Sequence, residues 1–319
     1  MKEKPILAII VPCYNEEQVL PKTSGIFLGK IRELVNDGIV DGKSFVLFSD
    51  DGSTDATWEI VKELSAGNSA AKGISLSRNR GHQNALLAGM MEVKDMADVV
   101  VSIDCDGQQD INAIDGMLAK YANGCDIVYG VRKKRDTDSV FKRNTALAFY
   151  KLMKILGVEV IRNHADYRLV SSRALKALHE YREVNLFLRG LFPLLGFRTD
   201  VVHFDVRERL AGESHYPLAK MLNFALDGIT SLSVKPLRMI AIVGMAMSFL
   251  SFVMIAYSVV VYLIGKVVPG WSSSVIVASL VGGIQLLSLG VIGEYVGKIY
   301  LEVKGRPRYI IAEKCGNGL

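Results

Sequence analysis

Short apolar runs that end in polar turns alternate with longer amphipathic stretches over the first part of the chain. Runs of this kind are typical of buried parallel strands. The predicted strands are Ile6–Val11, Lys43–Phe48, Ile74–Ser77, the run that begins at Val100, and Asp126–Val131. Helices are expected between them, among them Ala85–Val93 and a segment near Ile111–Tyr121. Strands that alternate with helices at this spacing predict an α/β fold with a doubly wound, mostly parallel sheet.

The pattern is less regular in the middle of the chain. Phe141–Leu156 is predicted as an amphipathic helix and Val201–Val206 as a strand, with a polar break at Arg162–Arg168. Leu218–Val234 has apolar residues at helical spacing with charged residues interleaved. That pattern fits a helix in the membrane interface, although an ordinary core helix would look much the same.

Two long apolar runs follow Arg238. Met239–Ile264 has no charged residue, and the second run, at about 275–297, is interrupted only by Gln285 and Glu294. A bilayer span needs about 20 predominantly apolar residues, so both runs are predicted transmembrane helices. Basic residues flank the pair on the outside, and the loop between them holds one charge. The positive-inside rule therefore places both chain ends and the domain before the helices in the cytoplasm.

Composition narrows the class of protein and its cellular compartment. Half of the residues are hydrophobic and the mean hydropathy is +0.26, which is high for a soluble enzyme. The net charge of +5 comes without dense basic clusters and does not indicate nucleic-acid binding. The four cysteines form no CxxC pair and no zinc-ligand spacing, which favours reduced thiols in a cytoplasmic compartment. The first apolar run is too short for a signal peptide and is interpreted as a strand.

Two carboxylates end the strand that begins at Val100. Asp104 and Asp106 stand one residue apart, at the strand end where open α/β sheets bind ligands. Such a pair can share Mg²⁺ or Mn²⁺, which takes its remaining ligands from water and a substrate diphosphate. The alternative is that both residues only terminate the strand and cap the next segment of the chain.

The other predicted strands also end in turns rich in Asp, Asn or Gly, and these turns share one edge of the sheet. No GxGxxG or P-loop motif is present, which disfavours those nucleotide-binding modes. A nucleotide could still bind if Asp50 or Asp51 accepts a base N–H and a metal on Asp104 and Asp106 holds the diphosphate.

Four motifs at these strand ends carry a family resemblance. They are VPCYNEE from Val11, DDGSTD from Asp50, SRNRGHQNALLAG from Ser77 and DCDGQQD from Asp104. In this order and spacing they resemble the family 2 glycosyltransferases of the GT-A fold. Within that family the similarity is greatest to polyprenyl-phosphate glycosyltransferases, including bactoprenol glucosyltransferases and relatives of dolichol-phosphate mannosyltransferase. It runs over essentially the whole chain, including NHADYRL from Asn163, RLAGESHYP from Arg209 and the paired apolar runs.

The resemblance implies a nucleotide-diphospho-sugar donor and a metal site at Asp104 and Asp106. By similarity, the donor site comprises Pro12, Tyr14, Glu16, Asp50, Asp51, Arg78, Asn79, Asn84 and Asp104. In the resembling family the Asp of the NHADYRL segment lies beside the acceptor, so Asp166 is the candidate catalytic residue. The implied acceptor is a phosphate that is largely ionised at neutral pH. Asp166 is therefore expected to orient it or take up a residual proton rather than act as a strong base.

The acceptor phosphate itself is expected at Arg209 and Ser214, because a guanidinium suits bidentate phosphate contact. The basic run Arg132–Arg135 is expected to be a solvated loop, with phosphate contact as the alternative.

These inferences predict an inverting, metal-dependent enzyme that transfers a hexose from a nucleotide diphosphate sugar to polyprenyl phosphate, most simply glucose from UDP-glucose to undecaprenyl phosphate. GDP-mannose or another UDP-sugar is the alternative donor. A processive polysaccharide synthase is disfavoured, because a polymer channel needs more than two spans. A non-catalytic sugar-nucleotide-binding scaffold is disfavoured, because all three candidate carboxylates are present.

The predicted organisation has four parts: a cytoplasmic catalytic domain at 1–214, an interfacial helix region at 215–237, two transmembrane helices within 238–300, and a cytoplasmic tail at 301–319. The protein is expected in the bacterial plasma membrane as a homo-oligomer that associates through its transmembrane helices.

Overall fold

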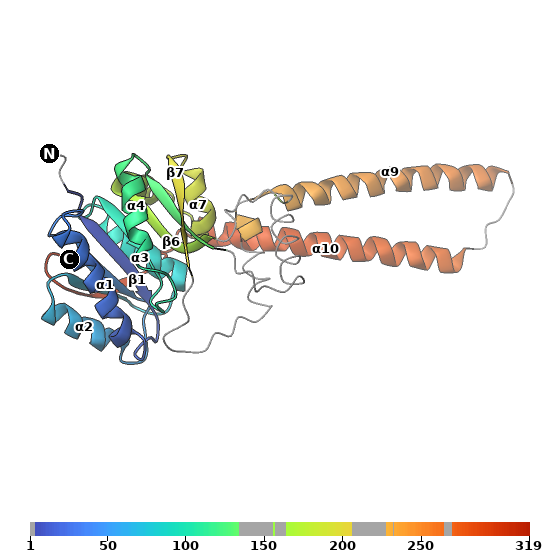
Figure 1. Ribbon diagram of the computed structural model, residues 1–319. Coiled ribbons are helices and arrows are strands. Elements are labelled where there is room, and N and C mark those ends of the chain that lie inside the picture. The colour runs from blue at the N-terminus through green and yellow to red at the C-terminus, as the bar shows by residue number, and fades with distance from the viewer. Residues whose placement is uncertain (1–3, 134–155, 157–163, 206–227, 232, 265–269) are drawn as a thin grey trace.

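The computed structural model describes residues 4–133, 156, 164–205, 228–231, 233–264 and 270–319. Within these residues the chain forms an α/β domain, from which two long helices project side by side (Figure 1). The strands are β1 (Leu7–Cys13), β2 (Phe45–Asp50), β3 (Ala71–Leu76), β4 (Val99–Ser102), β5 (Ile127–Arg132), β6 (His164–Ser171), β7 (Thr199–Phe204) and β8 (Ile311–Cys315). The helices are α1 (Leu20–Asn36), α2 (Thr57–Gly67), α3 (His82–Val93), α4 (Ala113–Ala122), α6 (Ser172–His179), α7 (Leu188–Leu194), α9 (Lys235–Leu263) and α10 (Trp271–Val303).

All eight described strands form one sheet in the order β7-β5-β6-β4-β1-β2-β3-β8. The pairs β1–β2, β1–β4, β2–β3 and β5–β7 are parallel, which confirms the predicted α/β class. Two strands run the other way. β6 lies antiparallel between β4 and β5, and β8 lies antiparallel on β3.

The sheet is covered on both faces. Along β1, Leu7, Ile9 and Val11 face one apolar core, whereas Ala8 and Ile10 face the other. The first core includes side chains of α1, α2 and α4, and the second includes side chains of α3, α6 and α7. A strand that is buried on both faces has no polar side, which explains why β1 is apolar almost throughout.

The sequence predicted a polar break at Arg162–Arg168. For the residues of this range that the structure describes the prediction was wrong, because β6 begins at His164. Polar and apolar residues alternate along this strand. Alternation places Asp166 and Arg168 on one face of the strand and Tyr167 and Leu169 on the other.

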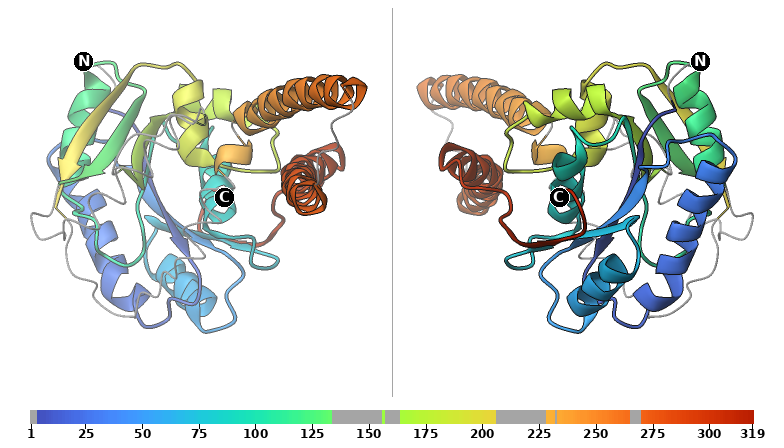
Figure 2. Two further views of the ribbon diagram at one scale, coloured as in Figure 1. Left: turned by 90° about the vertical axis from the view of Figure 1, so that its right-hand side faces the viewer. Right: turned by 90° about the vertical axis from the view of Figure 1, so that its left-hand side faces the viewer.

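Both predicted transmembrane runs are helices, α9 and α10, which are long and apolar enough to cross a membrane. The structure extends them beyond the predicted 239–264 and 275–297 at both outer ends. α9 starts and α10 ends beside the domain, and Figure 2 shows the pair standing apart from the sheet. The predicted helices at 141–156 and 218–234 lie largely outside the described residues.

The chain returns to the domain after α10. Ile311–Cys315, in the segment predicted only as a tail, forms the edge strand β8. The side chain of Glu313 accepts a hydrogen bond from Trp58 Nε1 at 2.7 Å, and Ser77 N–H donates to the carbonyl of Ile310 at 2.9 Å. The C-terminal residues therefore join the end of α10 to the edge of the sheet.

Candidate active site

The polar side chains predicted to form a site meet at one edge of the sheet. β1, β2 and β4 are parallel and end there, so the turns after Cys13, Asp50 and Ser102 are neighbours. β6 runs in the opposite direction beside β4, and Ser102 at the end of β4 pairs with Arg168, midway along β6. An antiparallel strand begins where its parallel neighbours end. This arrangement brings Asp166 to Asp104, although the two are far apart in the sequence.

The turn after β4 holds both carboxylates of the Asp-x-Asp pair. Gly107 has φ 70°, a conformation that glycine adopts at no steric cost. The buried side chain of Gln109 closes the turn, since its Oε1 accepts the N–H of Asp104 at 3.1 Å and its Nε2 donates to Asp104 Oδ2. Asp106 Oδ1 accepts the N–H of Gln108 at 3.0 Å. The two carboxylates thus stabilise the turn, as the structural alternative expected, yet both stay partly exposed.

The electrostatics of this turn fit a divalent cation. Burial raises the pKa of the Asp104 carboxyl, although the charge of His82 acts against the rise. The neighbouring carboxylates of Asp166 and Asp106 raise it further. Hard oxygen ligands that repel one another suit Mg²⁺ or Mn²⁺. Among the described residues no cluster of three His, Cys, Asp or Glu forms a complete metal site, so water and substrate oxygens would supply the other ligands.

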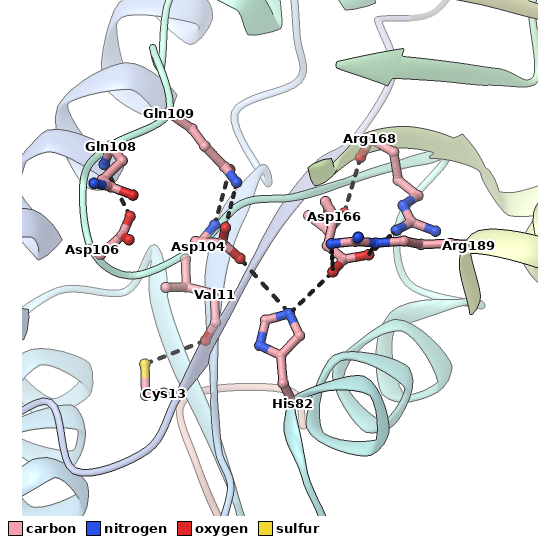
Figure 3. A network of polar contacts seen from close by, with 11 residues as sticks. Val11, Cys13, His82, Asp104, Asp106, Gln108, Gln109, Asp166, Arg168 and Arg189 are labelled. Atoms are coloured by element: carbon pink, nitrogen blue, oxygen red, sulfur yellow. Dashed lines mark hydrogen bonds and ion pairs between the residues drawn. The ribbon is translucent and has the colours of Figure 1, made fainter. Parts of the chain in front are cut away.

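Two arginines, Arg168 and Arg189, bind the carboxylate of Asp166 (Figure 3). Arg168 donates from Nη2 to Asp166 Oδ1, and Arg189 donates from Nε to Oδ1 at 3.2 Å and from Nη2 to Oδ2 at 2.9 Å. Arg168 is fully buried and lies over the ring of Phe192, 4.6 Å from its centre. Burial alone would raise the pKa of Asp166, but Arg168 and Arg189 hold it well below its usual range. Asp166 is therefore ionised at neutral pH and is a weak proton acceptor.

His82, the first residue of α3, lies between the two halves of the site. Its Nε2 is 3.7 Å from Asp104 Oδ1 and 3.8 Å from Asp166 Oδ2 (Figure 3). The side chain is 45% exposed, so it borders the space above both carboxylates. His82 belongs to one of the four sequence motifs, but the motif alone predicted no role for it. Arg189, which reaches the site from α7, was not predicted from the sequence.

Asp50 and Asp51, at the end of β2, are buried and brace the neighbouring loops. Asp50 accepts hydrogen bonds from the hydroxyl of Ser75 at 2.7 Å and from the N–H of Ser53 at 3.2 Å. Asp51 accepts the N–H groups of Arg80 at 2.7 Å and Gly81 at 2.8 Å. These bonds hold the loop after β3 against the turn after β2.

The remaining predicted donor residues lie on the same edge, at the end of β1, in the turns after β1 and β3, and at the start of α3. They are Pro12, which is buried, Glu16 and Asn84, which are half-buried, and Tyr14, Arg78 and Asn79, which are exposed. Asn84 donates from Nδ2 to the carbonyl of Arg80 at 2.8 Å and so shapes the same loop as Asp51. Together these residues lie at the same edge of the sheet as Asp104, which follows β4.

The two predicted acceptor residues, Arg209 and Ser214, lie outside the described residues. Arg132, the first residue of the basic run, ends β5 and is exposed. Its charge lowers the pKa of Asp104, so it lies near the site rather than in a remote loop.

The glycosyl transferase family 2 model matches residues 8–178. The uncharacterized glycosyltransferase YkoT of Bacillus subtilis is 46% identical over 97% of this chain and 92% of its own length. The bactoprenol glucosyl transferase of Shigella phage SfX is 36% identical over 97% of this chain and 99% of its own length. The crystal structure of mannosyl-3-phosphoglycerate synthase from Rubrobacter xylanophilus aligns with a TM-score of 0.48 and 14% identity over 74% of each chain. The family match over more than half of the chain, joined by these full-length relatives, shows that this protein belongs to glycosyl transferase family 2 and is a glycosyltransferase with the predicted GT-A fold.

Proposed function

We propose that this protein transfers a hexose, first of all glucose from UDP-glucose, to polyprenyl phosphate at the cytoplasmic face of the bacterial plasma membrane. The observation that carries the proposal is the position of His82 within 4 Å of both Asp104 and Asp166, because it shows that the carboxylate expected to bind the donor and the carboxylate bound by arginines lie close together. Relatives named bactoprenol glucosyl transferase, which align along nearly the whole chain, support the lipid acceptor.

The donor would bind along the ends of β1 to β4. Asp50 and Asp51, with the predicted residues in the turns after β1 and β3, would surround the nucleoside. The diphosphate would reach the turn that carries Asp104 and Asp106. When Mg²⁺ or Mn²⁺ is bound by these two residues, it offsets the charge of the departing nucleoside diphosphate.

The surroundings of Asp166 fit an anionic acceptor. Arg168 and Arg189 carry two positive charges against the one negative charge of Asp166, so this group has a net positive charge. A phosphate monoester is largely ionised at pH 7 and needs no strong base. Asp166 would therefore orient the acceptor and keep both guanidinium groups in place. A phosphate oxygen would attack the anomeric carbon from the side opposite the diphosphate, with inversion, while Arg209 and Ser214 hold the acceptor phosphate.

Helices α9 and α10 would attach the catalytic domain to the bilayer that contains the acceptor lipid. Lys235 and Arg238 at the start of α9 and Lys304 after α10 lie at the domain end of the pair, which supports a cytoplasmic orientation. Gly293 and Gly297 form a small-xxx-small pair on α10, and a Cβ added at either glycine would meet no atom within 4 Å. Such an open pair supports the predicted homo-oligomer.

A transfer assay tests the proposal directly. Purified protein is incubated with undecaprenyl phosphate, Mg²⁺ or Mn²⁺ and a panel of radiolabelled nucleotide sugars. We expect a single glycosyl residue on the lipid, with UDP-glucose as the best donor. Polymer formation would favour the synthase alternative. Donor binding without transfer to any lipid phosphate would favour the scaffold alternative.

A further inference from the structure

The last turn of α10 makes a specific contact with the catalytic domain. Glu302 accepts two backbone hydrogen bonds, from Val184 N–H to Oε2 and from Asn185 N–H to Oε1, both at 2.8 Å. The 33 residues of α10 span about 50 Å at about 1.5 Å per residue. The hydrocarbon core of a bilayer is only about 30 Å thick, so the helix can cross it and still present Glu302 to the domain.

The segment that Glu302 holds leads directly into α7. Leu188, the first residue of α7, donates its N–H to Oε1 of Gln83 at 2.8 Å, and Gln83 follows His82 on α3. The next residue is Arg189, whose guanidinium binds Asp166 through two hydrogen bonds. Residues 184–189 thus link the end of α10 to Asp166, because Glu302 binds one end of this segment and Arg189 at its other end binds the carboxylate.

A second contact holds the same segment from the tail. Arg308 donates from Nη2 to the carbonyl of Tyr181, three residues before Val184. Residues 181–185 are therefore fixed at both ends by groups that follow the proposed membrane span. α7 itself is held by buried side chains, among them Leu188, Leu191 and Phe192. Loss of the Glu302 contact should therefore shift the helix start without unfolding it.

We propose that Glu302 is a positioning residue that couples the membrane helix α10 to the Arg189–Asp166 pair. The inference rests on the proposed function, because it assigns Asp166 to the acceptor side of that reaction. When Glu302 holds the backbone at 184–185, Arg189 keeps the angle at which both of its donors meet Asp166. The lipid-embedded part of the protein and the carboxylate that orients the lipid phosphate then have a fixed relative position.

A simpler role for Glu302 is to fasten α10 to the domain, without effect on Arg189. A double-mutant cycle separates the two roles, because residues that act through one another show non-additive effects. Glu302→Gln keeps the size of the side chain but removes its charge and one acceptor. Glu302→Asp keeps the charge on a shorter side chain. Glu313→Gln is the matched control, since Glu313 lies after α10 in β8 and, like Glu302, accepts an N–H, in this case from Trp58.

We expect Glu302→Gln to lower kcat for transfer about tenfold, because small misplacements of orienting groups cost large factors in rate. Donor affinity by calorimetry and the melting temperature should stay close to wild type. Glu302→Asp should lower kcat less than Glu302→Gln does. Glu313→Gln should lower kcat by less than about twofold. In an Arg189→Lys background, Glu302→Gln should lower kcat by less than about a further twofold. The orientation of Arg189 that Glu302 supports is already lost in that background.

Hydrogen exchange gives a readout that does not depend on turnover. Glu302→Gln should speed amide exchange at 184–190, whereas Glu313→Gln should leave it unchanged. Unchanged exchange in Glu302→Gln would overturn the inference. A full tenfold loss of kcat when Glu302→Gln is added to Arg189→Lys would overturn it as well. A wild-type protein that transfers no sugar would overturn the proposed function instead. Exchange at 188–190, beyond the two amides that Glu302 binds directly, would still show whether Glu302 acts on Arg189.

Discussion

Arg189 binds Asp166 from a different element, with its Nε 3.2 Å from Oδ1 and its Nη2 2.9 Å from Oδ2. Such a bidentate pair fixes the plane of the carboxylate as well as its charge. Together with Arg168 it keeps Asp166 ionised, so the carboxylate is suited to orient a substrate rather than to take up a proton. This relationship sets the expectation for a substitution at Asp166.

Asp166→Asn should lower kcat for transfer by about 10²-fold or more, because orientation of reacting groups contributes strongly to rate. The variant leaves two arginines without their carboxylate, while the donor-binding turns after β1 to β3 are untouched. Donor affinity by calorimetry should therefore stay near wild type. Asp95→Asn is the control, since Asp95 forms surface ion pairs with Lys94 and Lys176. Lost donor binding with normal turnover at saturation would assign Asp166 to the donor site.

Asp106→Asn should make transfer strongly dependent on added metal. The substitution removes one negative charge but keeps an oxygen that can accept the N–H of Gln108. A turn-capping carboxylate would tolerate that change, whereas a metal ligand would not. We expect a large increase in the Mg²⁺ or Mn²⁺ concentration needed for half-maximal activity, and EDTA should abolish wild-type transfer. Full activity of Asp106→Asn in excess chelator would disprove the metal assignment.

His82→Gln should slow transfer without weakening donor binding to the same extent. Gln can still donate a hydrogen bond, but it lacks the imidazole that lies near Asp104 and Asp166. We expect a kcat loss of about tenfold, in the range of a misplaced orienting group. His179→Gln, at the end of α6, is the control for loss of a histidine elsewhere. If the two variants behave alike, His82 lies beside Asp104 and Asp166 without a role in transfer.

The sequence predicted the parallel part of the sheet because β1, β2 and β4 are apolar runs that end in polar turns. It did not predict β6, although polar and apolar residues alternate from His164 onward as in a strand with one polar face. Asp166 and Arg168 on the polar face belong to the candidate active site, so the segment resembled a break. β8 was missed because Ile311–Cys315 is a short edge strand whose partner, β3, lies far away in the sequence.

The candidate site was predictable to the extent that its residues belong to local motifs. Asp104, Asp106 and the aspartates after β2 follow strands directly, so their common edge follows from topology. Arg189 comes from a short helix after an irregular segment, and no local pattern connects it to Asp166. Only the fold places it there.

Gly52→Ala should weaken donor binding and destabilise the domain. Gly52 has φ +67°, and a Cβ there would lie 2.5 Å from the backbone carbon of Arg78. The left-handed conformation alone costs a non-glycine residue about 1–3 kcal/mol. The clash would also push apart the two loops that Asp51 joins. Gly42→Ala, where no atom lies within 4 Å of the added Cβ, is the matched control. A melting temperature and donor affinity equal to those of Gly42→Ala would contradict this account.

Arg209→Ala should raise the apparent KM for polyprenyl phosphate by about tenfold or more, because hydrogen bonds between charged groups contribute about 1.5–3 kcal/mol. Donor affinity should remain nearly constant. Arg209→Lys should recover only part of the effect, since an ammonium cannot reproduce the bidentate fork of a guanidinium. Arg132→Ala is the informative comparison, because Arg132 lies close enough to lower the pKa of Asp104. If Arg132→Ala raises the acceptor KM and Arg209→Ala does not, the phosphate binds at the end of β5. The acceptor phosphate would then lie beside Arg132, at the end of β5, rather than at Arg209.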